Sequence, residues 1–128
     1  MRALPVISVI LLLFLACSGP SPEELASLAA KGYYDHLLKG EYTLFLEGKS
    51  GADSLPDAYR EQLLTTYRQF MALQDKNHHG IREVRISNAR TDTLLKYTNV
   101  FLVLCFGDST NEEVVVPMVE HEGRWRMK

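Results

Sequence analysis

The spacing of apolar residues changes at Gly80, and this change constrains the fold more than any other feature of the sequence. Before it, apolar or small residues recur at helical spacing from Leu25 to Leu73, whereas after it they alternate or form short apolar runs. Turn sequences such as "GDSTN" and "EGRW" separate these runs, which predicts antiparallel strands. The order is typical of an α+β fold, with two N-terminal helices packed on a curved antiparallel sheet of three to four strands.

The first helix is predicted over residues 21–39. Ser21 can cap it, Pro22 suits its first turn, and Glu24 completes a capping box. Gly32 lies within its apolar stripe, where a glycine costs about 1 kcal/mol relative to alanine. We therefore expect Gly32 to permit the close approach of another element. The side chains expected in the buried stripe are Leu25, Leu28, Ala29 and Leu37.

A second long helix is predicted over residues 56–75, with Ser54 as its cap. A short helical turn is expected before it, at "EYTLFLEG". We expect the side chains of Tyr42, Phe45 and Leu46 to point inward from that turn. The apolar stripe of the second long helix is expected to hold Tyr59, Leu63, Thr66, Tyr67, Phe70 and Leu73.

The strand in "LLKYTNVFLVLCFG" is apolar on both faces from Val100 to Phe106. A sheet with one wet face would alternate apolar and polar residues along this strand. One layer of helices covers only one face, so something else must cover the other. The alternatives are the curvature of the sheet, the segment around Phe45, or a second copy bound through the sheet face.

The N-terminus is predicted to be a signal peptide over residues 1–16. Its apolar stretch, from Ala3 to Leu15, is shorter than the roughly 20 residues of a membrane span. The sequence "FLAC" resembles a bacterial lipobox, which implies lipid attachment at Cys17 and membrane association through that lipid. Residues 17–21 are then a tether, and residues 22–128 form a single α+β domain. The alternative is an ordinary signal peptide in which Cys17 is a chance cysteine.

This resemblance implies a lipoprotein of the bacterial cell envelope. Ser18 follows the cysteine where an aspartate would resemble an inner-membrane retention signal, so we expect the outer membrane. Cys105 then has no disulfide partner, and its strongly apolar surroundings predict a buried core thiol. A disulfide between Cys17 and Cys105 would require the lipoprotein interpretation to be wrong.

The composition excludes one class of partner. The net charge is −2 and no run of Lys or Arg is present, so no nucleic-acid surface is predicted. His78 and His79 are adjacent, but zinc requires three or four convergent ligands. A solvated loop is the preferred interpretation of this pair. We predict no metal site and no cofactor.

The order of elements resembles the cystatin-like fold of nuclear transport factor 2-like proteins, and among these the small secreted lipoproteins. The resemblance covers residues 22–128 and rests on "YYDHLLKGEY", "NHHGI" and the terminal Gly-turn with Trp125 and Arg126. It implies a pocket between helices and sheet, where enzymes of the family place acidic, His or Tyr groups. Here the only helical candidates are in "YYDH", and the neighbouring residues Asp35 and His36 cannot share a helix face.

We therefore predict a binding or interaction module rather than an enzyme, and the sequence does not identify its small ligand or protein partner. No catalytic residue is assigned. The alternatives are an isomerase- or dehydratase-like enzyme using Asp35 or His36, and a structural component of an envelope assembly. The residues expected to line a pocket are Tyr33, His36, Tyr59, Tyr67, Phe101 and Trp125.

Overall fold

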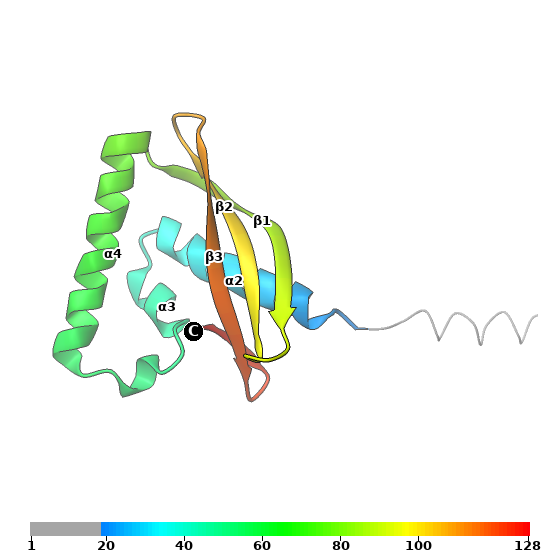
Figure 1. The fold of residues 1–128 in the computed structure, drawn as a ribbon. Helices are drawn as coiled ribbons and strands as arrows, with labels where there is room; N and C mark the ends of the chain where they lie inside the picture. Colours follow the sequence, from blue (N-terminus) through cyan, green and yellow to red (C-terminus); the bar gives the residue numbers. More distant parts are fainter. Residues whose placement is uncertain (1–18) are drawn as a thin grey trace, which may run out of the picture.

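The structure is a computed structural model that describes residues 19–128, so the predicted signal peptide and Cys17 lie outside it. Its α+β order confirms the predicted fold class (Figure 1). The elements are α2 (Pro22–Leu38), α3 (Tyr42–Glu47), the 3-10 turn η1 (Ala52–Ser54), α4 (Asp57–His78), β1 (Ile81–Asp92), β2 (Tyr97–Phe106), β3 (Asn111–His121) and β4 (Arg124–Met127).

The four strands form one antiparallel sheet in the order β1-β2-β3-β4. β2 lies inside the sheet, where Val100 pairs with Ala89 of β1 and Val116 of β3. The register between β1 and β2 shifts between Ile86 and Asn88, which is where a bulge bends a strand. The sheet is therefore curved around the helices, as predicted.

Helix α2 lies across one face of the sheet (Figure 1). Ser21 caps it as predicted, because its hydroxyl accepts a hydrogen bond of 3.2 Å from the Glu24 N–H. The buried side chains of the helix are Ala26, Ser27, Ala30 and Leu37. They pack against the sheet residues Val84, Val100, Leu102 and Leu104.

The predicted stripe of α2 was partly wrong. Leu37 is buried, but Leu25 is 39% exposed and Leu28 is 63% exposed. Small side chains at Ala26 and Ala30 face the sheet instead, because they let the helix backbone approach it closely. The prediction for Gly32 was wrong as well, since a Cβ atom built there would meet no atom within 4 Å.

Helix α4 stands beyond the β3 edge of the sheet rather than across its face (Figure 1). This position explains why its predicted stripe was partly wrong: Tyr67 packs against the core and Leu63 is half-buried, but Leu64 is the one fully buried residue of the helix, and Tyr59, Phe70 and Leu73 are exposed. Pro56, not Ser54, occupies the N-cap position. The helix continues three residues further than predicted and ends at His78, and its C-cap residue His79 has a left-handed φ of 58°.

The other face of the sheet is covered by no helix in the part of the chain that the structure describes. Phe101 and Val103 are half-buried there, and Val115 is 52% exposed. Cys105 is free and only 2% exposed, which confirms the prediction of a buried thiol. Within residues 19–128, no helix has the length and apolarity needed to cross a membrane.

Candidate functional site

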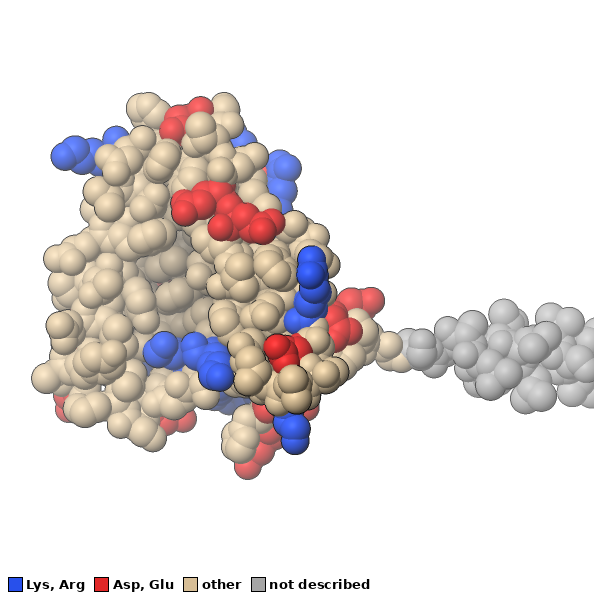
Figure 2. Space-filling view, viewed as in Figure 1, with Lys and Arg blue, Asp and Glu red and all other residues tan. Residues whose placement is uncertain are grey.

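A groove of about 260 Å³ opens between the helices and the free edge of β3. Figure 2 shows the face on which it lies, hollowed between α4 and the sheet, with acidic side chains above the hollow and basic side chains below it. The residues that line the groove are Tyr34, Phe45, Lys49, Tyr67, Val115, Val116, Pro117, Met127 and Lys128.

Three aromatic rings form one wall of the groove, one from each helix. The ring of Phe45 in α3 meets Tyr34 of α2 at 5.3 Å between centroids and Tyr67 of α4 at 4.9 Å. Both contacts are edge-to-face, with interplanar angles of 89° and 90°, an arrangement that aromatic pairs favour. The wall therefore holds its shape without a ligand.

The two tyrosine hydroxyls of this wall remain protonated at neutral pH. Burial raises the pKa of Tyr34, and the neighbouring Tyr67 raises it further. Burial also raises the pKa of Tyr67, with a smaller contribution from Tyr59. Because a neutral phenol both donates and accepts hydrogen bonds, the wall offers polar contacts without charge.

Two lysines line one end of the groove, but the ammonium group of Lys128 lies over the Tyr97 ring, outside the groove lining, so Lys49 is the lysine free to supply charge there. Lys49 follows α3, and Lys128 follows β4. The ammonium group of Lys128 lies 4.6 Å from the centroid of the Tyr97 ring, a cation–π distance. The lysine end of the groove therefore favours an acidic group on whatever binds there.

The edge of β3 beside the groove is only half paired. β4 pairs with residues 118–121 of β3, and the Lys128 N–H donates to the Pro117 carbonyl over 2.8 Å. Backbone groups of alternate residues in a strand point to the same side, so those of Val115 and Glu113 point the same way as those of Pro117. No strand among the described residues pairs with them. Unused donors and acceptors thus lie along the groove.

The predicted pocket residues are not brought together. Tyr67 lines the groove, whereas Tyr33 and Trp125 contact each other, through the Tyr33 hydroxyl and the Trp125 carbonyl, under β4. Tyr59 is 46% exposed. Phe101 lies on the opposite sheet face, where the Arg90 guanidinium is 5.8 Å from its ring centroid.

The residues weighed for catalysis lie away from the groove. His36 is half-exposed, and its Nδ1 lies 3.0 Å from a carboxylate oxygen of Glu41. Asp35 forms an ion pair of 2.8 Å with Lys31 on the surface of α2. Neither residue lines the groove, so the structure gives them no shared site.

The residues predicted to line the pocket did not include Lys49, nor Tyr34, which was considered only as part of "YYDH". Tyr33 was expected to line the pocket, and its neighbour Tyr34 was not chosen because adjacent helical residues point in different directions. Phe45 was expected to point inward, which is confirmed, but nothing in the sequence showed that α2 and α4 would each add a ring beside it.

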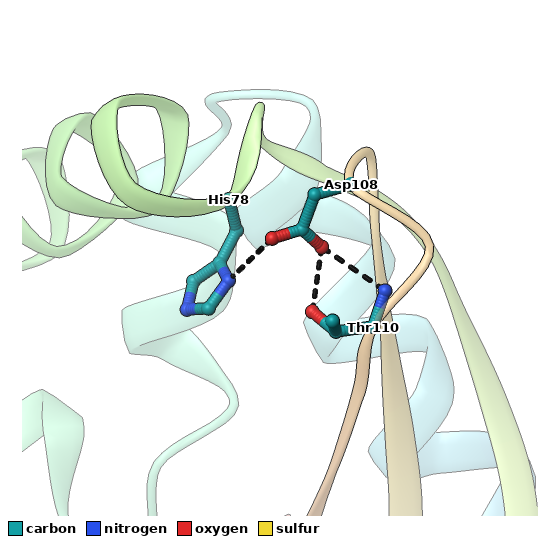
Figure 3. Close-up of polar contacts among 3 residues, drawn as sticks. All are labelled: His78, Asp108 and Thr110. Atoms are coloured by element: carbon teal, nitrogen blue, oxygen red, sulfur yellow. Dashed lines mark hydrogen bonds and ion pairs between the residues drawn. The ribbon is translucent and has the colours of Figure 1, made fainter.

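His78 takes part in a clasp at the end of α4 (Figure 3). Its Nδ1 lies 3.0 Å from Oδ2 of Asp108, and its ring stacks on Phe106 at 4.2 Å. The other oxygen of Asp108 accepts hydrogen bonds from the Thr110 hydroxyl and N–H. His79 is exposed, and within the described residues no three His, Cys, Asp or Glu side chains group as a metal site.

The hydrogen bonds of Asp108 strengthen the clasp. Those from Thr110, and then the contact with His78, lower the pKa of the Asp108 carboxyl to about 2. The carboxylate is therefore charged at neutral pH and joins the end of α4 to the β2–β3 turn. This contact fixes one end of α4, and with it one wall of the groove.

Comparison with known proteins supports the fold. No protein-family model matches the chain, and a search of curated proteins finds no match. Among solved structures, it is similar to a Campylobacter jejuni protein described as an NTF2-like transpeptidase, with a TM-score of 0.62 and 13% sequence identity. The match covers 84% of this chain and 97% of the other. The chain therefore has an NTF2-like fold.

Proposed function

We propose that this chain is a lipid-anchored binding module of the bacterial cell envelope that captures an extended peptide segment. The observation that carries the proposal is the unpaired edge of β3 at Val115 and Glu113, which lies beside an aromatic groove. An extended peptide can add a strand to such an edge, with backbone hydrogen bonds for affinity and alternate side chains for specificity.

The groove suits the side chains of such a strand. Alternate residues of the peptide would face the wall of Tyr34, Phe45 and Tyr67, where apolar and aromatic side chains gain most from burial. An acidic residue would lie at the end of the groove that holds Lys49. The preferred peptide is therefore extended, apolar at alternate positions and acidic at one end.

The name of the structural neighbour includes an activity, transpeptidation, which we do not extend to this chain. Covalent acyl transfer requires an activated nucleophile that reaches the substrate. The groove is lined by Tyr and Lys but by no Ser, Thr or Cys, and Cys105 is buried within the sheet. An isomerase- or dehydratase-like reaction would need a base, and the candidates Asp35 and His36 lie elsewhere.

Selection from a random peptide display library on the purified protein tests the proposal. Enriched peptides should show alternating apolar residues, and their binding should protect the Val115 amide from hydrogen exchange. Val115→Pro removes the outward N–H group but keeps the bonds between β3 and β2. Pro117 already occupies an equivalent outward position in the same strand, so the substitution should be tolerated.

The matched control is Val115→Thr, which keeps the N–H group and the β-branched shape. Selected peptides should bind Val115→Thr with an affinity close to that of the unaltered protein. Their affinity for Val115→Pro should fall severalfold, by up to about tenfold, the effect of one lost hydrogen bond. Equal binding to both variants, or no enrichment of any peptide, would contradict strand addition.

The anchor has its own test. Residues 14–17 form the lipobox-like "FLAC", so Cys17→Ser should abolish lipid attachment and release the protein from membranes. Labelling with radioactive palmitate in a bacterial host, followed by membrane fractionation, measures both effects. We propose the outer membrane as the location. Acylated Cys17→Ser protein in the membrane fraction would contradict the assignment of Cys17.

A further inference from the structure

The turn between β1 and β2 presents two leucines to solvent. Leu94 is 91% exposed and Leu95 is 59% exposed. One oxygen of the Asp92 carboxylate accepts hydrogen bonds within the turn from the Leu94 N–H at 3.0 Å and the Leu95 N–H at 2.9 Å. The Lys96 N–H closes the turn on the Asp92 carbonyl at 2.9 Å. The leucines are therefore held outward by the backbone geometry of the turn.

This turn lies beside the start of α2 (Figure 1). The hydroxyl of Thr91, one residue before the turn, donates a hydrogen bond to the carboxylate of Glu23 in the first turn of α2. Leu25 and Leu28 of the same helix are also exposed. The turn with its two exposed leucines thus lies near the point where the N-terminal segment joins the domain.

The tether between Cys17 and α2 is short. Five residue steps separate Cys17 from Pro22, and an extended chain covers at most about 18 Å over that length. A lipid on Cys17 would therefore hold the start of α2 within about 18 Å of the membrane surface. The β1–β2 turn, in contact with that helix, would be held close to the same surface.

We propose that Leu94 and Leu95 insert into the membrane to which the N-terminus is anchored. The inference rests on the proposed lipid attachment at Cys17. Transfer of leucine side chains from water to the acyl boundary of a bilayer is favourable. The exposed cation Lys96, next to Leu95 in the chain, suits lipid phosphates.

Insertion of the turn would set the orientation of the domain. β2 runs away from this turn to the β2–β3 turn at the opposite end of the sheet, where Asp108 holds the end of α4 (Figures 1 and 3). The β2–β3 turn would therefore point away from the membrane. The groove, on the β3 edge between these ends, would stay open to a partner in the aqueous phase.

The test places a fluorescent label at each end of the sheet. The full chain with Leu94→Cys, or with Ser109→Cys in the β2–β3 turn as the matched control, is isolated from bacterial membranes and labelled with a nitrobenzoxadiazole dye. Each protein is reconstituted into vesicles of phosphatidylethanolamine and phosphatidylglycerol, with or without nitroxide-bearing lipid. Cys105 is buried, so it should not react in the folded protein.

At position 94 we expect blue-shifted emission and loss of most fluorescence when nitroxide lipid is present, and at position 109 neither effect. Equal, water-like emission at both positions in membrane-bound protein would overturn the insertion but leave the lipid anchor intact. Blue-shifted emission without nitroxide quenching would mean that the leucines contact protein instead. Recovery of the chain in the soluble fraction would overturn the anchor and the insertion together.

Discussion

The hydroxyl of Tyr33 donates a hydrogen bond of 2.6 Å to the backbone carbonyl oxygen of Trp125. The bond joins α2 to β4, two elements that are 92 positions apart in the sequence. It matters for the candidate site because β4 ends at Met127, which lines the groove together with the next residue, Lys128. The position of Met127 and Lys128 in the groove therefore depends on the hydrogen bond between Tyr33 and Trp125.

Tyr33→Phe should lower the free energy of unfolding by about 1–3 kcal/mol, because it leaves the Trp125 carbonyl without its partner. A urea melt followed by circular dichroism measures the change. Tyr59→Phe is the matched control, since Tyr59 is exposed on α4, and its effect should stay within about 0.5 kcal/mol. Equal losses in both variants would show that the bond to Trp125 contributes nothing specific.

Two glycines should respond to alanine in opposite directions. A Cβ atom on Gly48 would lie 2.4 Å from Cδ1 of Tyr33, whose ring is held by its bond to Trp125. Gly48→Ala should therefore destabilise the protein by about 1–3 kcal/mol. A Cβ atom on Gly32, inside α2, would meet nothing within 4 Å, so Gly32→Ala should stabilise it by about 0.5–1 kcal/mol. Thermal melts would refute this account if the two signs were the same.

The order and type of the elements could be predicted because their signals are local. The capping box at Ser21 and Glu24 marks the start of α2, and the turn sequence "GDSTN" separates two strands. These signals need only neighbouring residues. The bounds of α2 were therefore predicted to within one residue at each end.

The packing of the helices could not be predicted in the same way. Periodicity predicted that the helix face with Leu25 and Leu28 is buried. In the structure the neighbouring face, which carries the small residues Ala26 and Ala30, lies against the sheet instead. For α4, the sequence does not show that the helix stands beyond the edge of the sheet. The groove was missed for the same reason, since it exists only where three helices meet the unpaired part of β3.

The clasp between His78 and Asp108 should make stability depend on pH. The folded pKa of Asp108 is about 2, and the usual unfolded pKa is about 3.9. A carboxyl with a lowered folded pKa contributes stability that is fully present above its unfolded pKa and is lost as the pH falls through its folded pKa. The contribution of Asp108 should therefore disappear between about pH 4 and pH 2.

Asp108→Asn tests this dependence. Its melting temperature should lie a few degrees below that of the unaltered protein at pH 7, and the difference should shrink as the pH falls from about 4 to 2. Asp53→Asn is the control, because Asp53 is exposed in η1 and its substitution should have little effect at either pH. A difference that stays constant over this range would exclude the charge of Asp108 as its cause.

We predict that two copies of the chain associate through the uncovered face of the sheet. Phe101, Val103 and Val115 are adjacent there, on neighbouring strands that pair Phe101 with Val115. All the helices of the described domain lie elsewhere, so within one copy this apolar patch is covered only in part, by side chains such as Arg90 over the Phe101 ring. A symmetric dimer would bury the same patch twice.

Light scattering on the chain from Ser18 onward should give the mass of two copies at micromolar concentration. Phe101→Glu should give the mass of one copy, because it places a charge at the centre of the buried patch. Leu94→Glu, which also adds a charge at an exposed apolar position but on the β1–β2 turn, should leave the dimer intact. If the unaltered chain remained a single copy at high micromolar concentration, the dimer would be excluded. The apolar face of the sheet would then be exposed to water in the monomer.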